Sequence, residues 1–229
     1  MIIDLTHPLS ETIPVYPSKT RFSRKKHDLK NGVCLNDISL SSGIGTHMDA
    51  PRHFYAEGNS IDQIPLERFF GPACVLHLSE KVKDNANYSI SVEDLHVWEK
   101  THGSIPPKCL FFADTGWDRL WGKNSYCIPS ESGGCPYPGF SAEAAKLLVQ
   151  RKVNIVGIDT LGLDPGCNLE APAHQILLKE EIPLIECLAN LDKIPPKGAM
   201  VFALPMNIQG APEAPVRVVA FIGKKFEDV

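Results

Sequence analysis

The sequence has no Cys-x-x-Cys pair, no long apolar run and no excess of charge of one sign. Its 7 cysteines are scattered, so their spacing predicts neither a thiolate zinc site nor a disulfide framework, and we expect reduced, mostly buried thiols. Lys and Arg number 23 against 27 Asp and Glu, and this balance disfavours nucleic acid as a partner. The amino terminus has an acid at position four and no apolar run. We therefore expect no signal peptide, no membrane contact and a cytoplasmic location.

Length and turn formers predict how the chain is organised. A chain of 229 residues suits one domain, which we place at 1–229. The 17 glycines and 19 prolines indicate many turns between short strands, in a mixed α/β protein. Runs rich in Val, Ile, Leu and Phe predict strands at 1–5, 36–40, 44–50, 73–78, 109–113, 155–159, 184–188, 199–205 and 216–222. Helices are expected over 92–100, 142–151 and 172–180.

One short basic run, at 24–27, departs from the even charge distribution. It is consistent with an anion-binding edge near the entrance to a site or with a solvated loop, and such runs are usually solvated. We expect the loop.

The segment 42–54 concentrates reactive side chains in a tight backbone. If it is extended, Gly43, Gly45, His47 and Asp49 share one face, because side chains alternate along a strand. The glycines leave room for an ion or a substrate to approach the backbone. His53 follows Pro51 on a turn and can return to the same space. Imidazole beside carboxylate suits a divalent metal, although a structural hydrogen-bonded pair is the alternative.

Further ligands must come from distant parts of the chain, and two residues stand out. His174 lies at the start of an expected helix. Glu186 lies in an apolar, strand-like run, where a carboxylate is costly to bury unless it is paired or bound to metal. Asp159 and Asp164 could orient ligands or could simply build turns.

The run Gly-Thr-His-Met-Asp-Ala-Pro-Arg-His-Phe, at 45–54, resembles the His-x-Gly-Thr-His-x-Asp-x-Pro-x-His-Phe signature of the cyclase-like metal-dependent hydrolases. This family includes bacterial kynurenine formamidase and isatin hydrolase. Further matches lie at 4–9, 13–17, 114–117, 138–141 and 157–160, and in the spacing from His174 to Glu186. The resemblance therefore extends over nearly the whole chain.

The resemblance implies roles for particular residues. His47 and Asp49 would bind metal, Asp49 and Glu186 could bridge two ions, and His174 would hold the second ion. His53 would donate and accept the proton. The metal implied is a divalent ion, Zn or Mn.

The resemblance also implies the fold and the partners. The family has a swivelling β/β/α fold with a central sheet or partial barrel of short strands, usually assembled as a homodimer or homotetramer. Tyr16 falls where related enzymes place an aromatic residue against a small-molecule substrate.

One residue departs from the signature. Gly43 stands where the family has its first His ligand, so an ion there would keep His47, Asp49 and Glu186. Three protein ligands suffice for a catalytic metal. We expect a metal-dependent hydrolase that cleaves a C–N bond of a small aryl formamide or cyclic amide by metal-activated water, with His53 as acid and base. The alternative is a non-catalytic binding or regulatory protein. An active enzyme could load less metal or take the missing ligand from water or another residue.

Overall fold

A computed structural model describes residues 1–16, 19–28, 32–83, 85–129 and 134–223. Its main feature is an eight-stranded sheet in which β12 also pairs with β4. That pairing closes seven strands into a barrel-like ring, and β1 attaches to β12 outside it. The order is β1 (Ile2–Asp4), β12 (Glu213–Ile222), β11 (Lys197–Pro205), β5 (Phe70–His77), β7 (Leu110–Asp114), β9 (Ile155–Ile158), β10 (Leu184–Glu186) and β4 (His47–Asp49). The predicted α/β fold with a central barrel-like sheet is confirmed.

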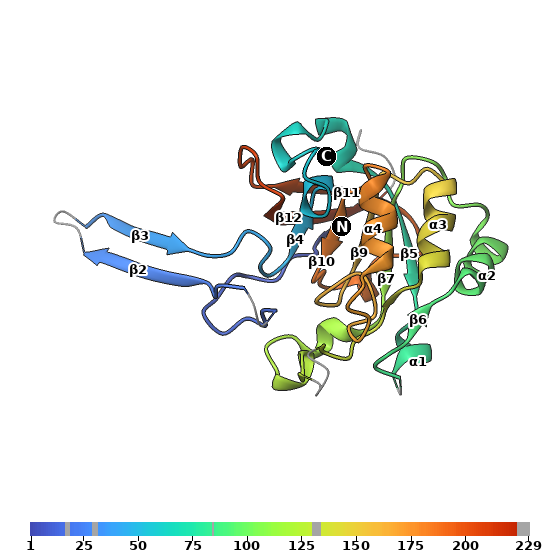
Figure 1. The fold of residues 1–229 in the computed structure, drawn as a ribbon, viewed down its shortest axis with the longest axis horizontal. Helices are drawn as coiled ribbons and strands as arrows, with labels where there is room; N and C mark the ends of the chain where they lie inside the picture. Colours follow the sequence, from blue (N-terminus) through green and yellow to red (C-terminus); the bar gives the residue numbers. More distant parts are fainter. Residues whose placement is uncertain (17–18, 29–31, 84, 130–133, 224–229) are drawn as a thin grey trace.

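Four neighbouring strands, β5, β7, β9 and β10, run parallel. Parallel neighbours need long crossover connections, and helices α2 (Val92–His102), α3 (Ala142–Gln150) and α4 (Pro172–Lys179) lie within them. Figure 1 shows these helices together along one side of the sheet. Ser91 and Ser141 cap α2 and α3, each accepting a hydrogen bond from a backbone N–H of the first turn. All three helices start where the sequence predicted.

Two apolar cores hold the ring and the helices together. Met48, Val75 and Ile185 belong to the core inside the ring. Phe111 and Leu177 belong to the core between the ring and the helices. Because side chains alternate along a strand, the neighbours of Met48 on β4 point outward, away from the interior of the ring.

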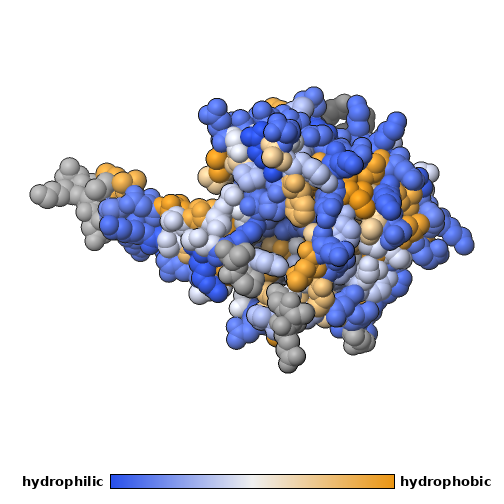
Figure 2. Space-filling model, viewed as in Figure 1, coloured by the Kyte–Doolittle hydropathy of each residue, from blue (hydrophilic) through white to orange (hydrophobic). Residues whose placement is uncertain are grey.

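A two-stranded arm formed by β2 (Ser23–Asp28) and β3 (Cys34–Ser39) extends away from the rest of the molecule (Figure 1). All six residues of β3 are exposed, including the apolar Leu35 and Ile38. Figure 2 shows apolar surface on this arm among hydrophilic residues. The basic run at 24–27 forms most of β2, so the expectation of a loop was wrong. Its cross-strand pairing with β3, which the charges do not reveal, makes it a strand.

The smaller elements are α1 (Ser79–Val82) and the parallel pair β6 (Ser89–Ile90) and β8 (Gly139–Phe140). The strand predicted at 44–50 is limited to β4, because Gly45 has φ +63° and breaks the extended backbone before His47. No helix within the described residues is both long and apolar enough to cross a membrane.

The prediction that all cysteines are reduced was wrong. Cys127 and Cys135 form a disulfide, with their Cα atoms 5.2 Å apart. They lie eight residues apart in the sequence, and their proximity in the fold cannot be read from spacing alone. Cys74, Cys109 and Cys187 are buried free thiols, as expected.

Candidate metal centre

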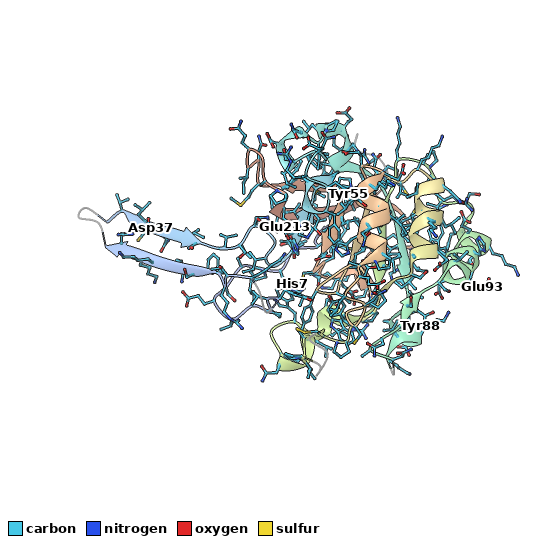
Figure 3. All side chains as sticks on the ribbon, in the orientation of Figure 1. His7, Asp37, Tyr55, Tyr88, Glu93 and Glu213 are labelled. Carbon is cyan, nitrogen blue, oxygen red and sulfur yellow. A yellow bond between two sulfur atoms is a disulfide. The ribbon has the colours of Figure 1, made fainter. Side chains whose placement is uncertain are left out.

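The pairing of three strands brings the acidic and imidazole side chains together. On β4, His47 lies opposite Glu186 of β10, and Asp49 lies opposite Glu213 of β12. Residues directly opposite in an antiparallel pair project to the same face. Met48 points into the core of the ring, so these four side chains lie on its outer face. Figure 3 places Glu213 in the body of the molecule, far from Asp37 on the arm.

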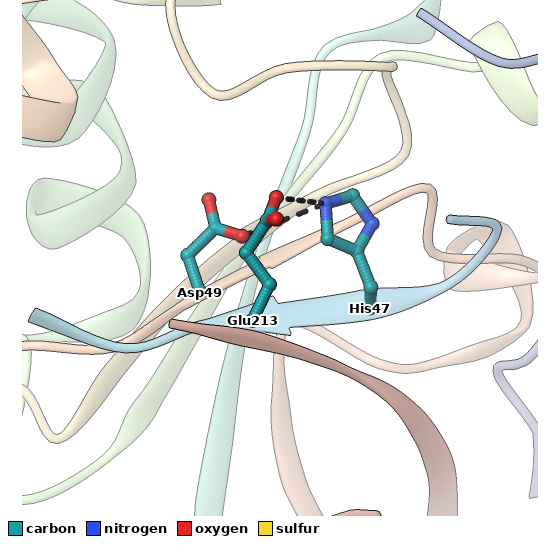
Figure 4. Close-up of side chains that lie close together, drawn as sticks. All are labelled: His47, Asp49 and Glu213. Carbon is teal, nitrogen blue, oxygen red and sulfur yellow. Dashed lines mark ion pairs between the residues drawn. The ribbon is translucent and has the colours of Figure 1, made fainter. Parts of the chain in front are cut away.

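The orientation of His47 leaves one ring nitrogen free to bind a cation. Its Nδ1 lies 2.8 Å from the carbonyl oxygen of Gly45, and a carbonyl only accepts, so Nδ1 carries the proton. The Nε2 lone pair then faces Asp49 Oδ1 at 3.5 Å and Glu186 Oε2 at 3.4 Å (Figure 4 shows the Asp49 pair). His47 Nε2 and Asp49 Oδ1 are buried and have no hydrogen-bond partner among the described residues. Two buried acceptors facing one another call for a shared cation or donor.

His174, in the first turn of α4, approaches from the other side. Its Nδ1 donates to Asp164 Oδ2 at 2.5 Å, while Nε2 lies 2.9 Å from Glu186 Oε1 and 3.6 Å from Asp49 Oδ2. Phe54 stacks on the imidazole with ring centroids 5.3 Å apart. A carboxylate behind a histidine fixes its tautomer and orientation, as is common at metal sites.

The two aspartates considered as positioning residues differ in what they contact. Asp164 accepts from the backbone N–H groups of Ala173 and His174 in addition to the imidazole. Asp159 accepts instead from Thr115 and from the backbone of Trp117, and its hydrogen bonds go to no candidate ligand. Asp164 therefore orients a candidate ligand, whereas Asp159 builds a turn.

Two overlapping groups of side chains have the geometry to hold a metal ion. One consists of His47, Asp49 and Glu213, and the other of Asp49, His174 and Glu186. Within each group the ligand atoms lie within 4.8 Å of one another, and all the residues are buried. Mixed nitrogen and oxygen donors of this kind fit Zn or Mn. The unpaired buried atoms of His47 and Asp49 agree with that fit.

The charges of the site shift the pKa values of its members. Burial alone would raise the pKa of the Asp49 carboxyl, but the nearby His174, His53 and His47 rings lower it well below its usual range. Burial alone would lower the pKa of His174, but hydrogen bonds to Asp164 and Glu186 and the nearby Asp49 carboxylate raise it well above normal. The cluster thus attracts positive charge strongly.

Sequence reasoning missed Glu213 and Lys19. The Lys19 ammonium forms an ion pair with Glu213 Oε1, and Ser42 Oγ donates to Glu213 Oε2 at 3.3 Å. Burial alone would lower the pKa of Lys19, but the carboxylates of Asp49 and Glu213 raise it. Glu213 lies in a Pro-Glu-Ala-Pro-Val run, so it is a carboxylate among apolar residues, the same signal that marks Glu186 in the sequence. Nothing in the sequence around Lys19 marks that residue.

A cavity of about 270 Å³ opens onto the site. His53, at the end of the 3₁₀ turn Pro51–His53, lines it with Nδ1 3.9 Å from Glu213 Oε1. Tyr16 also lines it, together with Tyr137, Leu161 and Leu169. The six residues singled out from the sequence, His47, Asp49, His53, His174, Glu186 and Tyr16, therefore all lie in or beside one cavity.

Comparisons with known proteins find a matching family model and related enzymes. A family model described as "Putative cyclase" matches residues 3–165. Kynurenine formamidase of Geobacillus thermodenitrificans is 32% identical over 94% of this chain and 94% of that protein. Isatin hydrolase of Roseibium aggregatum is 28% identical over 82% of this chain and 75% of that protein.

Solved structures agree with the sequence comparisons. Isatin hydrolase A from Ralstonia solanacearum superposes with a TM-score of 0.92 at 31% identity, over 97% of this chain and 92% of the other. A protein described as a potential metal-dependent hydrolase with cyclase activity superposes with a TM-score of 0.74 at 25% identity, over 98% and 99% of the two chains.

Proposed function

The chain belongs to the cyclase family, and from that premise we propose that it is a metal-dependent hydrolase of small amides. One observation carries the proposal: the buried atoms His47 Nε2 and Asp49 Oδ1 lie 3.5 Å apart and have no hydrogen-bond partner among the described residues. The Glu186 carboxylate lies beside them, within 3.4 Å of His47 Nε2 and 2.9 Å of His174 Nε2. The names of its relatives, isatin hydrolase and kynurenine formamidase, support hydrolysis of a C–N bond.

The ligands we assign are His47, Asp49, His174 and Glu186, with Asp49 and Glu186 each placed between the two histidines. A divalent ion held there, Zn or Mn, would acidify a water molecule and polarise the amide carbonyl. Asp164 holds His174 with Nε2 toward the cluster. The carbonyl of Gly45 does the same for His47.

His53 is the acid and base of the proposed reaction. It is partly exposed, lines the cavity and is not among the residues of either donor group. An imidazole suits proton transfer near neutral pH, because its unperturbed pKa lies there. In this role it takes a proton from the attacking water and returns it to the departing nitrogen.

The cavity favours a small, planar and uncharged amide. Its volume of about 270 Å³ lies just below the range of about 300–1,000 Å³ usual for small-molecule sites, and its walls include aromatic and aliphatic side chains. Lys19 is the one cationic Lys or Arg among the described lining residues, and it is already paired with Glu213. A substrate carboxylate would therefore find no free Lys or Arg among the described lining residues, so we favour a cyclic amide such as isatin over an amino-acid formamide such as N-formylkynurenine.

A binding or regulatory protein is the second candidate, favoured by Gly43 and by the Lys19 ion pair within the cluster. Hydrolysis assays on isatin, N-formylkynurenine and simple formanilides, with metal supplied and withheld, separate the two candidates. Metal-dependent turnover of any of these supports the enzyme. Metal binding with no turnover across the panel supports the second candidate.

We also propose that the chain assembles as a homodimer or homotetramer. The β2–β3 arm supports this, because it exposes Val33, Leu35 and Ile38 at 52–58% of their surface and makes a long projection from the body. An isolated two-stranded ribbon is marginally stable in water and gains from packing against a neighbour.

A further inference from the structure

The space beside Gly43 is filled by two charged groups from distant parts of the chain. A Cβ atom built at position 43 would lie 1.9 Å from Glu213 Oε1 and 2.1 Å from Lys19 Nζ. Real Cβ atoms essentially never come this close to another atom, so any side chain at 43 would have to displace both groups. Glycine at this position is therefore what allows Glu213 and Lys19 to lie where they do.

The backbone gives no other reason for this glycine. Gly45, two residues later, has φ +63°, a conformation that strongly favours glycine. Gly43 is not among the described residues with positive φ. The two glycines thus serve different ends: Gly45 permits a turn of the backbone, and Gly43 leaves space.

Glu213 has the position and surroundings of a metal ligand. It is 7% exposed and lies opposite Asp49 on the neighbouring strand. Its Oε1 is 3.9 Å from His47 Nε2, whose lone pair has no hydrogen-bond partner among the described residues (Figure 4). The unpaired Asp49 Oδ1 belongs to the same group. Two buried, unpartnered atoms 3.5 Å apart call for a cation or donor beside them, and Glu213 lies next to both.

We propose that Glu213 is a metal ligand that replaces the imidazole missing at Gly43, with Lys19 as its positioning residue. This rests on the proposed function, in which the cluster binds a divalent ion. An imidazole ligand is neutral, and a Glu213 carboxylate paired with a Lys19 ammonium is also neutral as a unit. The exchange therefore keeps the total charge of the site while moving the donor from position 43 to β12.

Lys19 also explains how Glu213 is held. A lone buried carboxylate beside Asp49 and Glu186 would be repelled by both. The ammonium on Oε1 offsets that repulsion, and the Ser42 hydroxyl fixes Oε2. Glu213 is thereby kept over Gly43 with its carboxylate toward His47.

The test is calorimetric titration of Zn and Mn into chelator-stripped protein. Glu213→Gln should weaken metal binding by at least about tenfold, since loss of even an outer partner of a ligand costs roughly 10–100-fold. Glu99→Gln is the matched control, because Glu99 is a largely buried glutamate paired with Arg151 away from the site. It should leave metal affinity unchanged. A folded Glu213→Gln protein that binds metal as tightly as the parent overturns the inference.

Three further variants keep the inference testable if Glu213→Gln does not fold. Gly43→His alone should not tighten binding, because Glu213 and Lys19 fill its space, whereas Gly43→His with Glu213→Ala and Lys19→Met, which removes both groups, should restore affinity to near the parent level. Failure of this folded triple variant to bind better than Glu213→Ala with Lys19→Met counts against the inference. Lys19→Met should bind the same number of ions as the parent. A gain of one ion overturns the inference, because Lys19 would then have held the position itself.

The outcomes separate the two proposals. If the parent protein binds no divalent ion, the metal-dependent function fails and the ligand assignment fails with it. If the parent binds metal and hydrolyses amides but Glu213→Gln binds equally well, the inference alone fails.

Discussion

Asp164→Asn tests whether the orientation of a ligand, His174, affects metal binding, because Asp164 contacts His174 but is not itself one of the assigned ligands. Asp164 Oδ1 accepts from Ala173 N at 2.7 Å, and Oδ2 accepts from His174 N at 3.0 Å and His174 Nδ1 at 2.5 Å. The asparagine side chain has one acceptor oxygen, so it cannot accept from both Ala173 and His174 as the two carboxylate oxygens do. If the asparagine amide nitrogen faces His174, Nδ1 of that ring must accept a hydrogen bond, which favours the tautomer with the proton on Nε2. Nε2 then has no lone pair to offer a metal.

The size of the effect follows from two opposing terms. Loss of an orienting carboxylate costs roughly 10–100-fold in metal affinity. Removing the same charge also lowers the raised pKa of His174, which makes the proton easier for a metal to displace. We therefore expect the low end, a loss of about tenfold, or about 1.4 kcal/mol.

The assay is metal affinity by competition with a chromophoric chelator at one fixed pH. Asp159→Asn is the control, because Asp159 is equally buried and accepts several hydrogen bonds, but from Thr115 and Trp117. It should lower the free energy of unfolding without weakening metal binding. The reasoning is refuted if both variants lose the same affinity, or if folded Asp164→Asn loses none.

Three further predictions concern catalysis, stability and assembly. His53→Gln should lower kcat by roughly 10²–10⁴-fold with metal affinity unchanged; loss of metal instead would make His53 a ligand. Both nitrogens of His77 face acceptors, and the hydrogen bond to Asp114 is the main reason that the pKa of His77 is raised. The charged His77 therefore adds about 1 kcal/mol to the free energy of unfolding below about pH 6.5, and this contribution is lost as the pH rises through the raised pKa. The free energy of urea unfolding of His77→Gln should therefore approach that of the parent at alkaline pH. A difference between the two proteins that does not change with pH contradicts this. Leu35→Lys with Ile38→Lys should reduce the native mass of the assembly in light scattering, whereas Leu66→Lys, at a residue that is more exposed but lies outside the arm, should not.

Local sequence was a good guide to the ring and to the helices. Strands β5, β7, β9 and β11 are apolar runs that fall within a few residues of their predictions, and the helices start at Ser or Pro signals. The β2–β3 arm was half missed. Residues 24–26 of its first strand are basic and exposed, so no hydrophobic pattern marks that strand.

The site could be predicted only where each residue had a local signal. His47, Asp49 and His53 stand in one motif, and Glu186 is a charge among apolar residues. Lys19 reaches the cluster through its ammonium, which lies beside Gly43 and Glu213, and pairing of β12 with β4 brings Glu213 beside Asp49. Contacts between segments about 170–195 residues apart depend on closure of the ring, which no single segment encodes.

Hydrolysis of isatin by chelator-stripped protein, measured before and after adding back Zn or Mn, tests the central claim most directly. Ring opening can be followed by loss of the isatin absorbance. We expect no turnover in stripped protein, recovery with a divalent ion, and no recovery in Asp49→Asn, whose carboxylate belongs to both donor groups. Turnover that survives metal removal, or equal recovery in Asp49→Asn, would contradict a metal-dependent hydrolase built on this cluster.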